Sequence, residues 1–350
     1  MPGGLLRTSL TGSMPKPEWL AEPGILFAPW RVTPERLAEA QDDAVRLAIA
    51  DQEAAGLDVI TDGEARRRHY IWGFLDGLTG IDTETLGTRQ SRGGRYVKET
   101  PVARIVGEVT RPRPVLVDAL RFAKRQATRP VKVTLPGPMT TVDSLLDTHY
   151  RGDERELALR FAAILNAEAR DLVAAGADVI QVDEPCFNIY VDKVRAWGIE
   201  TLERVFDGVT ATRAVHICYG YGIGRVLAWK RQNTSWGEYG ETLPLLAGAS
   251  VDQVSVECAA SGVDPAMLRG LGGRKDVLLG VIDVGTEDVE TPEVVAARIE
   301  RALPHVPPER IIASTDCGLV PRSRAAARGK LAAIVQGAAL ARARLGRAGA

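Results

Sequence analysis

The stretch that decides the fold is "DERELALRFAAILNAEARDLVAAGADVIQVDEPCF", Asp153 to Phe187. Its first part repeats apolar residues with the period of an amphipathic helix, and this pattern stops at Gly176. The run "DVIQVD", Asp178 to Asp183, is short, apolar and rich in β-branched residues, as expected of a buried strand. A helix followed directly by a buried strand is the repeating unit of parallel α/β sheets.

The same alternation extends from this stretch toward both ends of the chain. We predict eight strands, at Leu5–Leu10, Asp58–Asp62, Val131–Leu135, Asp178–Asp183, Ala214–Cys218, Val251–Glu257, Val277–Asp283 and Ile311–Thr315. Two of the intervening helices begin with a Thr N-cap followed by Pro, at Thr33 and at Thr291. Eight strands with helices between them predict an α/β fold of the (β/α)8 TIM barrel type.

One interval, Ala65 to Pro130, is too long for a single connecting helix. It contains "GGRYVKETPVARIVGEVTRPRP", which alternates apolar and polar residues between turn residues. We therefore expect a hairpin inserted after the second strand, within about residues 65–130, followed by a helix near Val115–Gln126. The chain of 350 residues fits a single catalytic barrel over residues 1–350.

Charge and hydropathy exclude some classes of partner. The formal net charge is −1 and no Lys/Arg run is present, so we expect no nucleic-acid partner. No apolar stretch approaches the roughly 20 residues that span a bilayer, and the first residues lack a signal-peptide pattern, so we expect a soluble, cytoplasmic protein without membrane contact. The four cysteines are far apart in sequence, which favours reduced thiols.

A candidate metal site lies at the ends of the predicted strands. His216 and Cys218 are two residues apart on a strand, so their side chains point to the same face. Imidazole and thiolate are zinc ligands, and Glu257 and Cys317 at other strand ends could complete a four-coordinate site. The alternative is that His216 and Cys218 are ordinary core residues, which would be the better interpretation of this pair alone. The additional ligand types at neighbouring strand ends favour zinc.

Three further strand-end residues form the set that an amino-acid ligand needs. Glu64 and Asp183 offer two carboxylates for an ammonium group, and Ser13 offers a hydroxyl for a carboxylate. Taken singly, each carboxylate could instead be a helix cap or a partner of Arg66 or Lys132.

Eight motifs in order resemble the catalytic C-terminal barrel of the cobalamin-independent methionine synthases. They are "TGSMPKP", "DGE", "LPGPMT", "VDEP", "HICYG", "VECA", "GVID" and "TDCGL". The resemblance runs from about Thr8 to Leu345, and the long members' second barrel is absent, so the chain is similar to the short, single-barrel branch. It implies a Zn²⁺ cofactor on the four ligands above, homocysteine as substrate, and Ser13, Glu64 and Asp183 as its binding residues.

The resemblance leaves the methyl donor open. Where the folate-using members carry a pterin-stacking Trp, a folate-contacting Glu and a proton-donating His, ungapped spacing places Ser144, Ile189 and Gly285. Losing the proton donor removes general-acid help worth roughly 10²- to 10⁴-fold. Either His69 or His149 substitutes for it, or a corrinoid or partner protein delivers the methyl group.

Two other functions remain open from the sequence. The same fold supports zinc-dependent alkyl transfer or lyase chemistry on another thiol, as in the epoxide-opening relatives. A non-catalytic barrel with a structural zinc is the third interpretation, because four protein ligands are common in structural sites.

Overall fold

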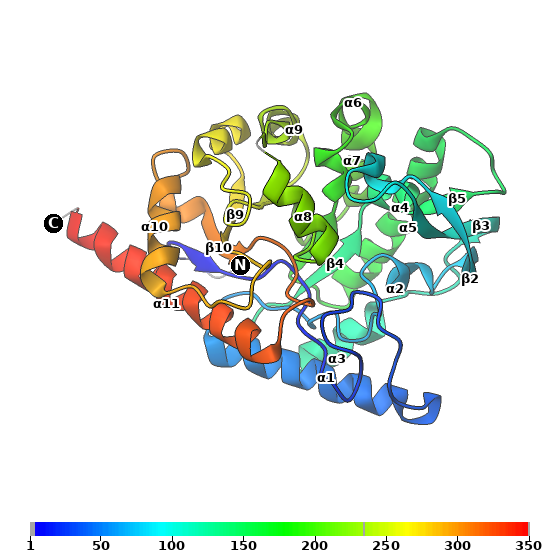
Figure 1. The fold of residues 1–350 in the computed structure, drawn as a ribbon, viewed down its shortest axis with the longest axis horizontal. Helices are drawn as coiled ribbons and strands as arrows, with labels where there is room; N and C mark the ends of the chain where they lie inside the picture. The colour runs from blue at the N-terminus through cyan, green and yellow to red at the C-terminus, as the bar shows by residue number, and fades with distance from the viewer. Residues whose placement is uncertain (1–3, 234, 349–350) are drawn as a thin grey trace.

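The computed structural model describes residues 4–233 and 235–348. At its centre lies a curled parallel sheet of seven strands in the order β1-β10-β9-β8-β7-β6-β4, surrounded by helices (Figure 1). These strands are β1 (Arg7–Thr8), β4 (Lys132–Pro136), β6 (Val179–Asp183), β7 (Thr212–Ile217), β8 (Gln253–Val256), β9 (Asp276–Ile282) and β10 (Ile311–Thr315). The fold is thus a mixed α/β fold, as the sequence predicted.

The second predicted strand, Asp58–Asp62, connects the two edges of this sheet. Ile60 forms an isolated parallel bridge with Val131, with hydrogen bonds from Ile60 N to Pro130 O (3.0 Å) and from Lys132 N to Ile60 O (2.8 Å). On its other side, Val59 N donates to Thr8 O of β1 (3.2 Å). The segment therefore bonds to both edge strands, β1 and β4.

Most residues of these strands are buried because the sheet is covered on both faces. Every residue of β6, β8 and β10 is buried. Helices cover the outer face, and the curled sheet encloses side chains on its inner face, which is why the strands are continuous apolar runs. This burial explains why short apolar runs in the sequence located these strands.

Eleven α-helices are described in residues 4–233 and 235–348, besides short 3-10 and π-helical turns. They are α1 (Pro34–Ala55), α2 (Trp72–Leu75), α3 (Val117–Gln126), α4 (Pro138–Asp143), α5 (Glu154–Ala174), α6 (Val191–Lys193), α7 (Ile199–Phe206), α8 (Gly224–Gln232), α9 (Glu238–Gly248), α10 (Pro292–Ala302) and α11 (Arg324–Ala348). As predicted, α1 and α10 begin at the prolines after Thr33 and Thr291. The helix expected near Val115–Gln126 is α3. None of these helices is long and apolar enough to cross a membrane.

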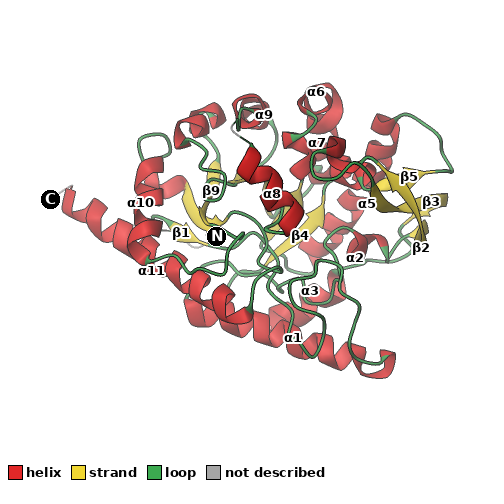
Figure 2. Ribbon diagram, viewed as in Figure 1, coloured by secondary structure: helices red, strands yellow, loops and turns green. Residues whose placement is uncertain are grey.

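A second, three-stranded sheet lies at one side of the molecule (Figure 2). In it β2 (Thr79–Arg89) pairs antiparallel with β3 (Thr100–Thr110), and β3 pairs in parallel with β5 (Leu145–Asp147). The alternating stretch recognised in the sequence contains β3 but not β2, and both strands lie within residues 65–130. The edge strand β5 was not predicted.

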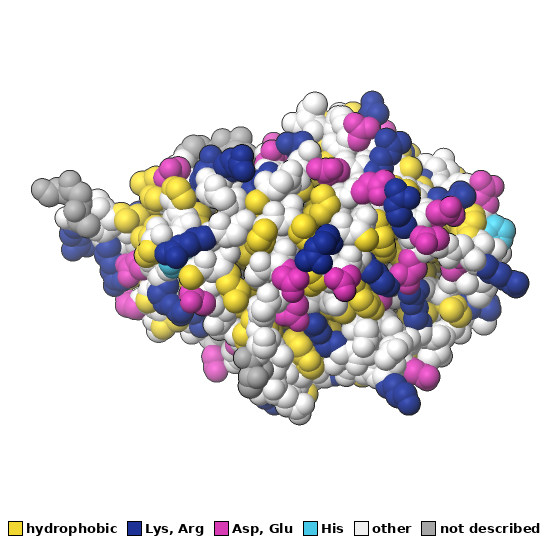
Figure 3. Space-filling model, turned by 90° about the horizontal axis from the view of Figure 1, so that it is seen from above, with side chains coloured by type: hydrophobic (Ala, Val, Ile, Leu, Met, Phe, Trp, Pro, Cys, Tyr) yellow, Lys and Arg dark blue, Asp and Glu magenta, His cyan; other side chains and the backbone are white. Residues whose placement is uncertain are grey.

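The surface carries charges of both signs. On the face shown in Figure 3, Lys and Arg side chains are interspersed with Asp and Glu, and apolar side chains lie between them. This mixture agrees with the near-zero net charge.

Candidate active site

A cavity of about 410 Å³ opens at the carboxyl ends of the parallel strands. Its lining includes seven of the nine residues singled out in the sequence, namely Ser13, Glu64, His69, Asp183, His216, Cys218 and Cys317. The two others, Glu257 and His149, are not among its lining residues. Strand-end position was therefore a good guide to the wall of this cavity.

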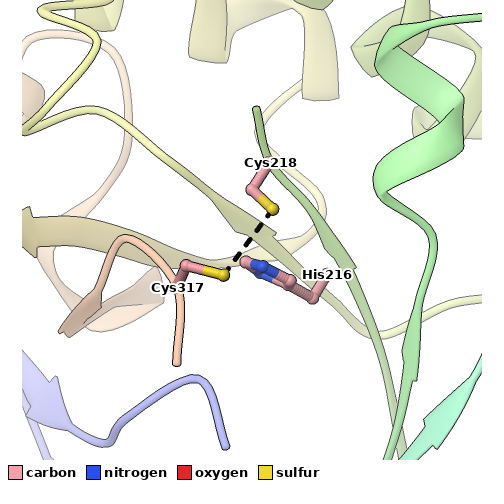
Figure 4. Close-up of side chains that lie close together, drawn as sticks. All are labelled: His216, Cys218 and Cys317. Carbon is pink, nitrogen blue, oxygen red and sulfur yellow. Dashed lines mark hydrogen bonds between the residues drawn. The ribbon is translucent and has the colours of Figure 1, made fainter. Parts of the chain in front are cut away.

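Three of the four predicted metal ligands form a cluster within the cavity. One ligand atom each of His216, Cys218 and Cys317 lies within 4.8 Å of the others, and all three residues are buried. His216 lies on β7, Cys218 follows the end of that strand, and Cys317 follows β10, so the sheet brings distant residues together (Figure 4). The two sulfur atoms are 3.9 Å apart.

The donor atoms of this cluster fit a zinc ion. The Nδ1 atom of His216 is 2.8 Å from the hydroxyl of Ser255 on β8, which fixes the orientation of the ring. Its Nε2 atom is buried and has no hydrogen-bond partner within residues 4–233 and 235–348. A buried ring nitrogen without a partner costs free energy unless a ligand satisfies it. One imidazole and two thiols are the donor set that zinc prefers.

The electrostatics of the cluster favour a thiolate at Cys218. The neighbouring Cys317 thiol, together with the His216 ring, holds the pKa of Cys218 well below its ordinary value. Although burial opposes it, Cys218 in turn raises the pKa of His216. Thiolates are the form in which cysteine binds metals.

Glu257, the fourth predicted ligand, is not brought into the cluster. It follows β8 directly, and its side chain is fully buried. One carboxylate oxygen accepts from Lys230 Nζ (2.6 Å) and the other from Tyr219 N (3.0 Å). The Glu257 carboxylate therefore lies next to the residue that follows Cys218, and it forms an ion pair with Lys230.

Ser13 lies on the loop after β1 with an available hydroxyl. Its Oγ atom is buried and lacks a partner among the described residues. The carbonyl of Ser13 accepts from Leu319 N (2.9 Å), which joins this loop to the loop after β10. A Cβ atom at Gly318 would lie 2.1 Å from Ser13 Oγ, so only glycine leaves the hydroxyl in place.

Glu64 is held in an unusual backbone conformation. Its φ is 55°, in the left-handed region that residues other than glycine seldom adopt. The strained turn is stabilised because Glu64 N donates to the Asp62 carboxylate (2.9 Å) and Glu64 O accepts from Arg67 N (3.0 Å). The Glu64 carboxylate accepts from Thr134 Oγ1 (2.9 Å). Local strain of this kind is common at functional sites.

Arg67 is a site residue that the sequence analysis missed. It is buried, donates to Thr134 O and Oγ1 (3.0 and 2.7 Å), and lies 3.6 Å from the Glu64 carboxylate. The sequence left open a structural pairing of Glu64 with Arg66, but Arg66 pairs with Asp42. The spacing of three residues between Glu64 and Arg67 could have indicated the pair.

Asp183 ends β6 and is buried in the cavity wall. Burial raises its pKa to about 7, and its carboxylate accepts from Gln181 Nε2 (2.8 Å). Burial also lowers the pKa of Lys132, the first residue of β4, to about 7. Lys132 donates to Leu10 O, so it is not a direct hydrogen-bond partner of Asp183. An incoming ammonium group would supply a cationic partner for the Asp183 carboxylate.

The two histidines considered as proton donors differ in position. His69 lines the cavity, but burial, with Arg92 as the next cause, lowers its pKa to about 3, so its charged form is scarce at neutral pH. His149 is exposed on the loop after β5, where its ring contacts Tyr150, outside the cavity lining.

Much of the remaining cavity lining is apolar or aromatic. It includes Leu26, Phe27, Ile71, Trp72, Leu86, Val97, Val102, Ile223 and Val226. Ser144 also lines the cavity, whereas Ile189 and Gly285 do not. The second sheet contributes Leu86 and Val102 to this lining, and the loop before α8 contributes Ile223.

Comparisons with known proteins agree on one family. Residues 6–340 match the sequence model described as "Cobalamin-independent synthase, Catalytic domain". A curated relative named methionine synthase, from Saccharolobus solfataricus, is 33% identical over 347 residues, which is 99% of this chain and 97% of the relative. The methionine synthase of Sulfurisphaera tokodaii is 34% identical over 339 residues, 97% of this chain and 93% of the relative.

Solved structures give the same result. A B12-independent methionine synthase from Shewanella sp. W3-18-1, solved in complex with selenomethionine, superposes with a TM-score of 0.94 at 42% identity, covering 98% of this chain and 99% of that one. A structure described as a putative vitamin-B12 independent methionine synthase from Listeria monocytogenes has a TM-score of 0.71 at 18% identity, covering 97% and 98%, and supports the fold alone.

Proposed function

Because the chain belongs to the cobalamin-independent methionine synthase family, we propose that it makes methionine by transferring a methyl group to the sulfur of homocysteine. The observation that carries this proposal is one cavity that contains both a His/Cys/Cys cluster with an unpartnered ring nitrogen and the set Ser13, Glu64 and Asp183.

His216, Cys218 and Cys317 would hold a zinc ion, and Glu257 is the candidate for a fourth protein ligand. When bound, zinc lowers the pKa of a thiol that it ligates, so homocysteine would carry a thiolate at neutral pH. Ser255 keeps the His216 ring oriented through Nδ1 and leaves Nε2 as its donor atom.

The other end of the cavity would orient the amino acid. Glu64 and Asp183 accept hydrogen bonds from the ammonium group, and Ser13 Oγ donates to the carboxylate of the substrate. With both ends fixed, the sulfur forms a bond to the methyl carbon while the bond from that carbon to the donor breaks, and the donor keeps the electron pair. Orientation of this kind is a large part of the rate gain in transfer between two substrates.

An eighth strand would close the seven-stranded parallel sheet. We infer a closed (β/α)8 barrel in which residues 58–62 act as the second strand, supported by their bonds to both β1 and β4. The antiparallel pair β2 and β3 is then an insertion after that strand. On this basis residues 1–350 form one catalytic unit.

Alkyl transfer to another thiol is the weaker candidate. A thiol without an ammonium group would leave the buried Asp183 carboxylate without that cationic partner, which is costly for its charged form, whereas Glu64 would keep Arg67 at 3.6 Å. The methyl donor, either a methylfolate or a methyl corrinoid, and the need for an accessory or methyl-carrier protein are separate questions.

A single set of assays tests the function. Zinc-loaded protein is incubated with homocysteine and either methylfolate or methylcobalamin, with and without cell extract, and methionine is measured. We expect methionine from one donor, and loss of at least about 10³-fold in the Cys317→Ser variant, because nucleophile activation is removed. If no combination yields methionine although the protein binds zinc and homocysteine, the result favours alkyl transfer to another thiol.

A further inference from the structure

A fully buried carboxylate that the proposed function does not use lies next to the metal cluster. It belongs to Asp316, the residue that follows β10. Its Oδ1 atom accepts from Cys258 N (3.0 Å) and Ala259 N (2.9 Å), and its Oδ2 atom accepts from Ala260 N (2.6 Å). All three donors are backbone N–H groups rather than a cation. A carboxylate is costly to bury without an ion pair, so stability alone does not account for this residue.

These hydrogen bonds join two strand ends that are not neighbours in the sheet. Asp316 follows β10, the three N–H groups belong to the loop after β8, and β9 lies between the two strands. The carboxylate reaches across β9 beside Gly280, where a Cβ atom would lie 2.2 Å from Asp316 Oδ1. Gly280 therefore makes room for the contact, as a glycine within a strand does where another group must approach closely.

Each of the two joined segments carries a candidate metal ligand. Cys317, a member of the cluster, directly follows Asp316, and Glu257 directly precedes Cys258. A shift of the loop after β8 relative to the end of β10 would therefore change the separation of Cys317 and Glu257. Because one carboxylate accepts from three successive N–H groups of that loop, it holds the two segments at a fixed separation.

We propose that Asp316 is a positioning residue that fixes the loop carrying Glu257 relative to Cys317, and so prepares the metal site before the ion binds. The inference rests on the proposed function, in which Cys317 and Glu257 are both zinc ligands. Residues that orient metal ligands without touching the ion typically contribute roughly 10- to 100-fold to metal affinity. Since Asp316 would act through the separation of the ligands, its loss should change the coordination geometry as well as the affinity.

The variant Asp316→Asn tests this role with little change in shape. The amide oxygen can replace only one of the two carboxylate oxygens, and the NH2 group then faces an N–H donor at the other position. We expect zinc to bind roughly 10- to 100-fold more weakly, measured by competition with a chromophoric chelator. In protein saturated with cobalt instead of zinc, the visible absorption bands of tetrahedral Co²⁺ should shift and lose intensity, because they depend on the ligand geometry.

The variant Gly280→Ala disturbs the same contact without changing a residue beside Cys317. Its methyl group would displace the Asp316 carboxylate, so zinc affinity and the cobalt bands should change in the same direction as in Asp316→Asn. In the double variant the two losses of affinity should not add, because both single changes break the same hydrogen bonds. The methyl group would also lie 2.7 Å from Val256 O, so circular dichroism and urea denaturation check the fold of each variant.

The matched control is Glu168→Gln. Glu168 is also fully buried and accepts from two successive backbone N–H groups, Val115 N (2.9 Å) and Leu116 N (2.7 Å). It lies on α5, outside the cavity lining. The control should lose stability in urea because buried hydrogen bonds are disturbed. It should keep its zinc affinity within about threefold, as expected of a distant site, and its cobalt bands should be unchanged.

The outcomes separate this inference from the proposed function. Zinc affinity that stays unchanged in folded Asp316→Asn overturns the positioning role. Weaker zinc binding with unchanged cobalt bands also overturns it, because a general loss of stability would explain that result, as does a Glu168→Gln control with the same shifts. If Asp316→Asn does not fold, Gly280→Ala decides alone. If the unmodified protein binds neither zinc nor cobalt at the cluster, the proposed function fails, and the inference fails with it.

Discussion

At the scale of the residue, the buried carboxylate of Asp183 lowers the stability of the folded protein at neutral pH, although it would help to bind the ammonium group of the substrate. Its pKa in the folded protein, about 7, lies above the ordinary 3.8, and burial is the main cause. Asp183 therefore favours the folded state at acid pH, and this contribution is lost as the pH rises through 7. We expect the unfolding free energy of metal-free Asp183→Asn, relative to the unmodified protein, to rise by about 2 to 3 kcal/mol between pH 5 and pH 8.

Urea denaturation at both pH values measures this difference. Asp118→Asn is the control, because the side chain of Asp118 is almost fully exposed and its loss measures the effect of removing a surface carboxylate. A pH-independent difference for Asp183→Asn would show that its pKa is not raised. The same variant should bind homocysteine more weakly, since one of the two carboxylates for the ammonium group is lost.

At the scale of the element, the short helix α4 depends on one glutamate. Glu184 accepts from Met139 N (2.9 Å), Thr140 N (2.9 Å) and Thr140 Oγ1 (2.7 Å) at the start of this helix. Glu184→Ala leaves these three buried donors unpaired, so we expect a loss of about 3 kcal/mol or more in unfolding free energy, measured in urea. Glu200→Ala removes a half-exposed pair with Arg155 and should cost no more than about 1 kcal/mol. Equal losses in the two variants would contradict the capping role.

The elements that the sequence predicted well are those with a buried face. The expected strand Ile311–Thr315 has the observed bounds of β10, and Asp178–Asp183 differs from β6 by one residue. The strand β2, which pairs with β3, has no buried residue, so its sequence carries no apolar alternation to detect. The orientation of Glu257 was also beyond prediction, because its partner Lys230 lies on another element and looks like a surface residue in "AWKRQ".

At the scale of the whole molecule, the sheet order explains why separate motifs meet. β7 and β10, which carry or precede the ligands of the cluster, are separated by β8 and β9 in the sheet. Cys218 and Cys317 are 99 residues apart, yet their sulfur atoms lie 3.9 Å apart because the curled sheet turns all strand ends toward one cavity. The sequence could predict which residue types stand at the strand ends, but the curvature of the sheet is what brings Cys218 and Cys317 together.

A metal ion at this cluster would therefore stabilise the fold as a whole. Because it joins the ends of strands that unfolding separates, its binding free energy adds to the unfolding free energy, by about 4 kcal/mol when free zinc is 1,000 times its dissociation constant. We expect removal of zinc by a chelator to lower the urea midpoint, and zinc to have no such effect on Cys317→Ser. Cys258→Ser, outside the cavity lining, should keep the full zinc-dependent shift. If Cys317→Ser responds to zinc as strongly as the unmodified protein, the stabilising ion is bound elsewhere, and the strands β7 and β10 are not joined through it.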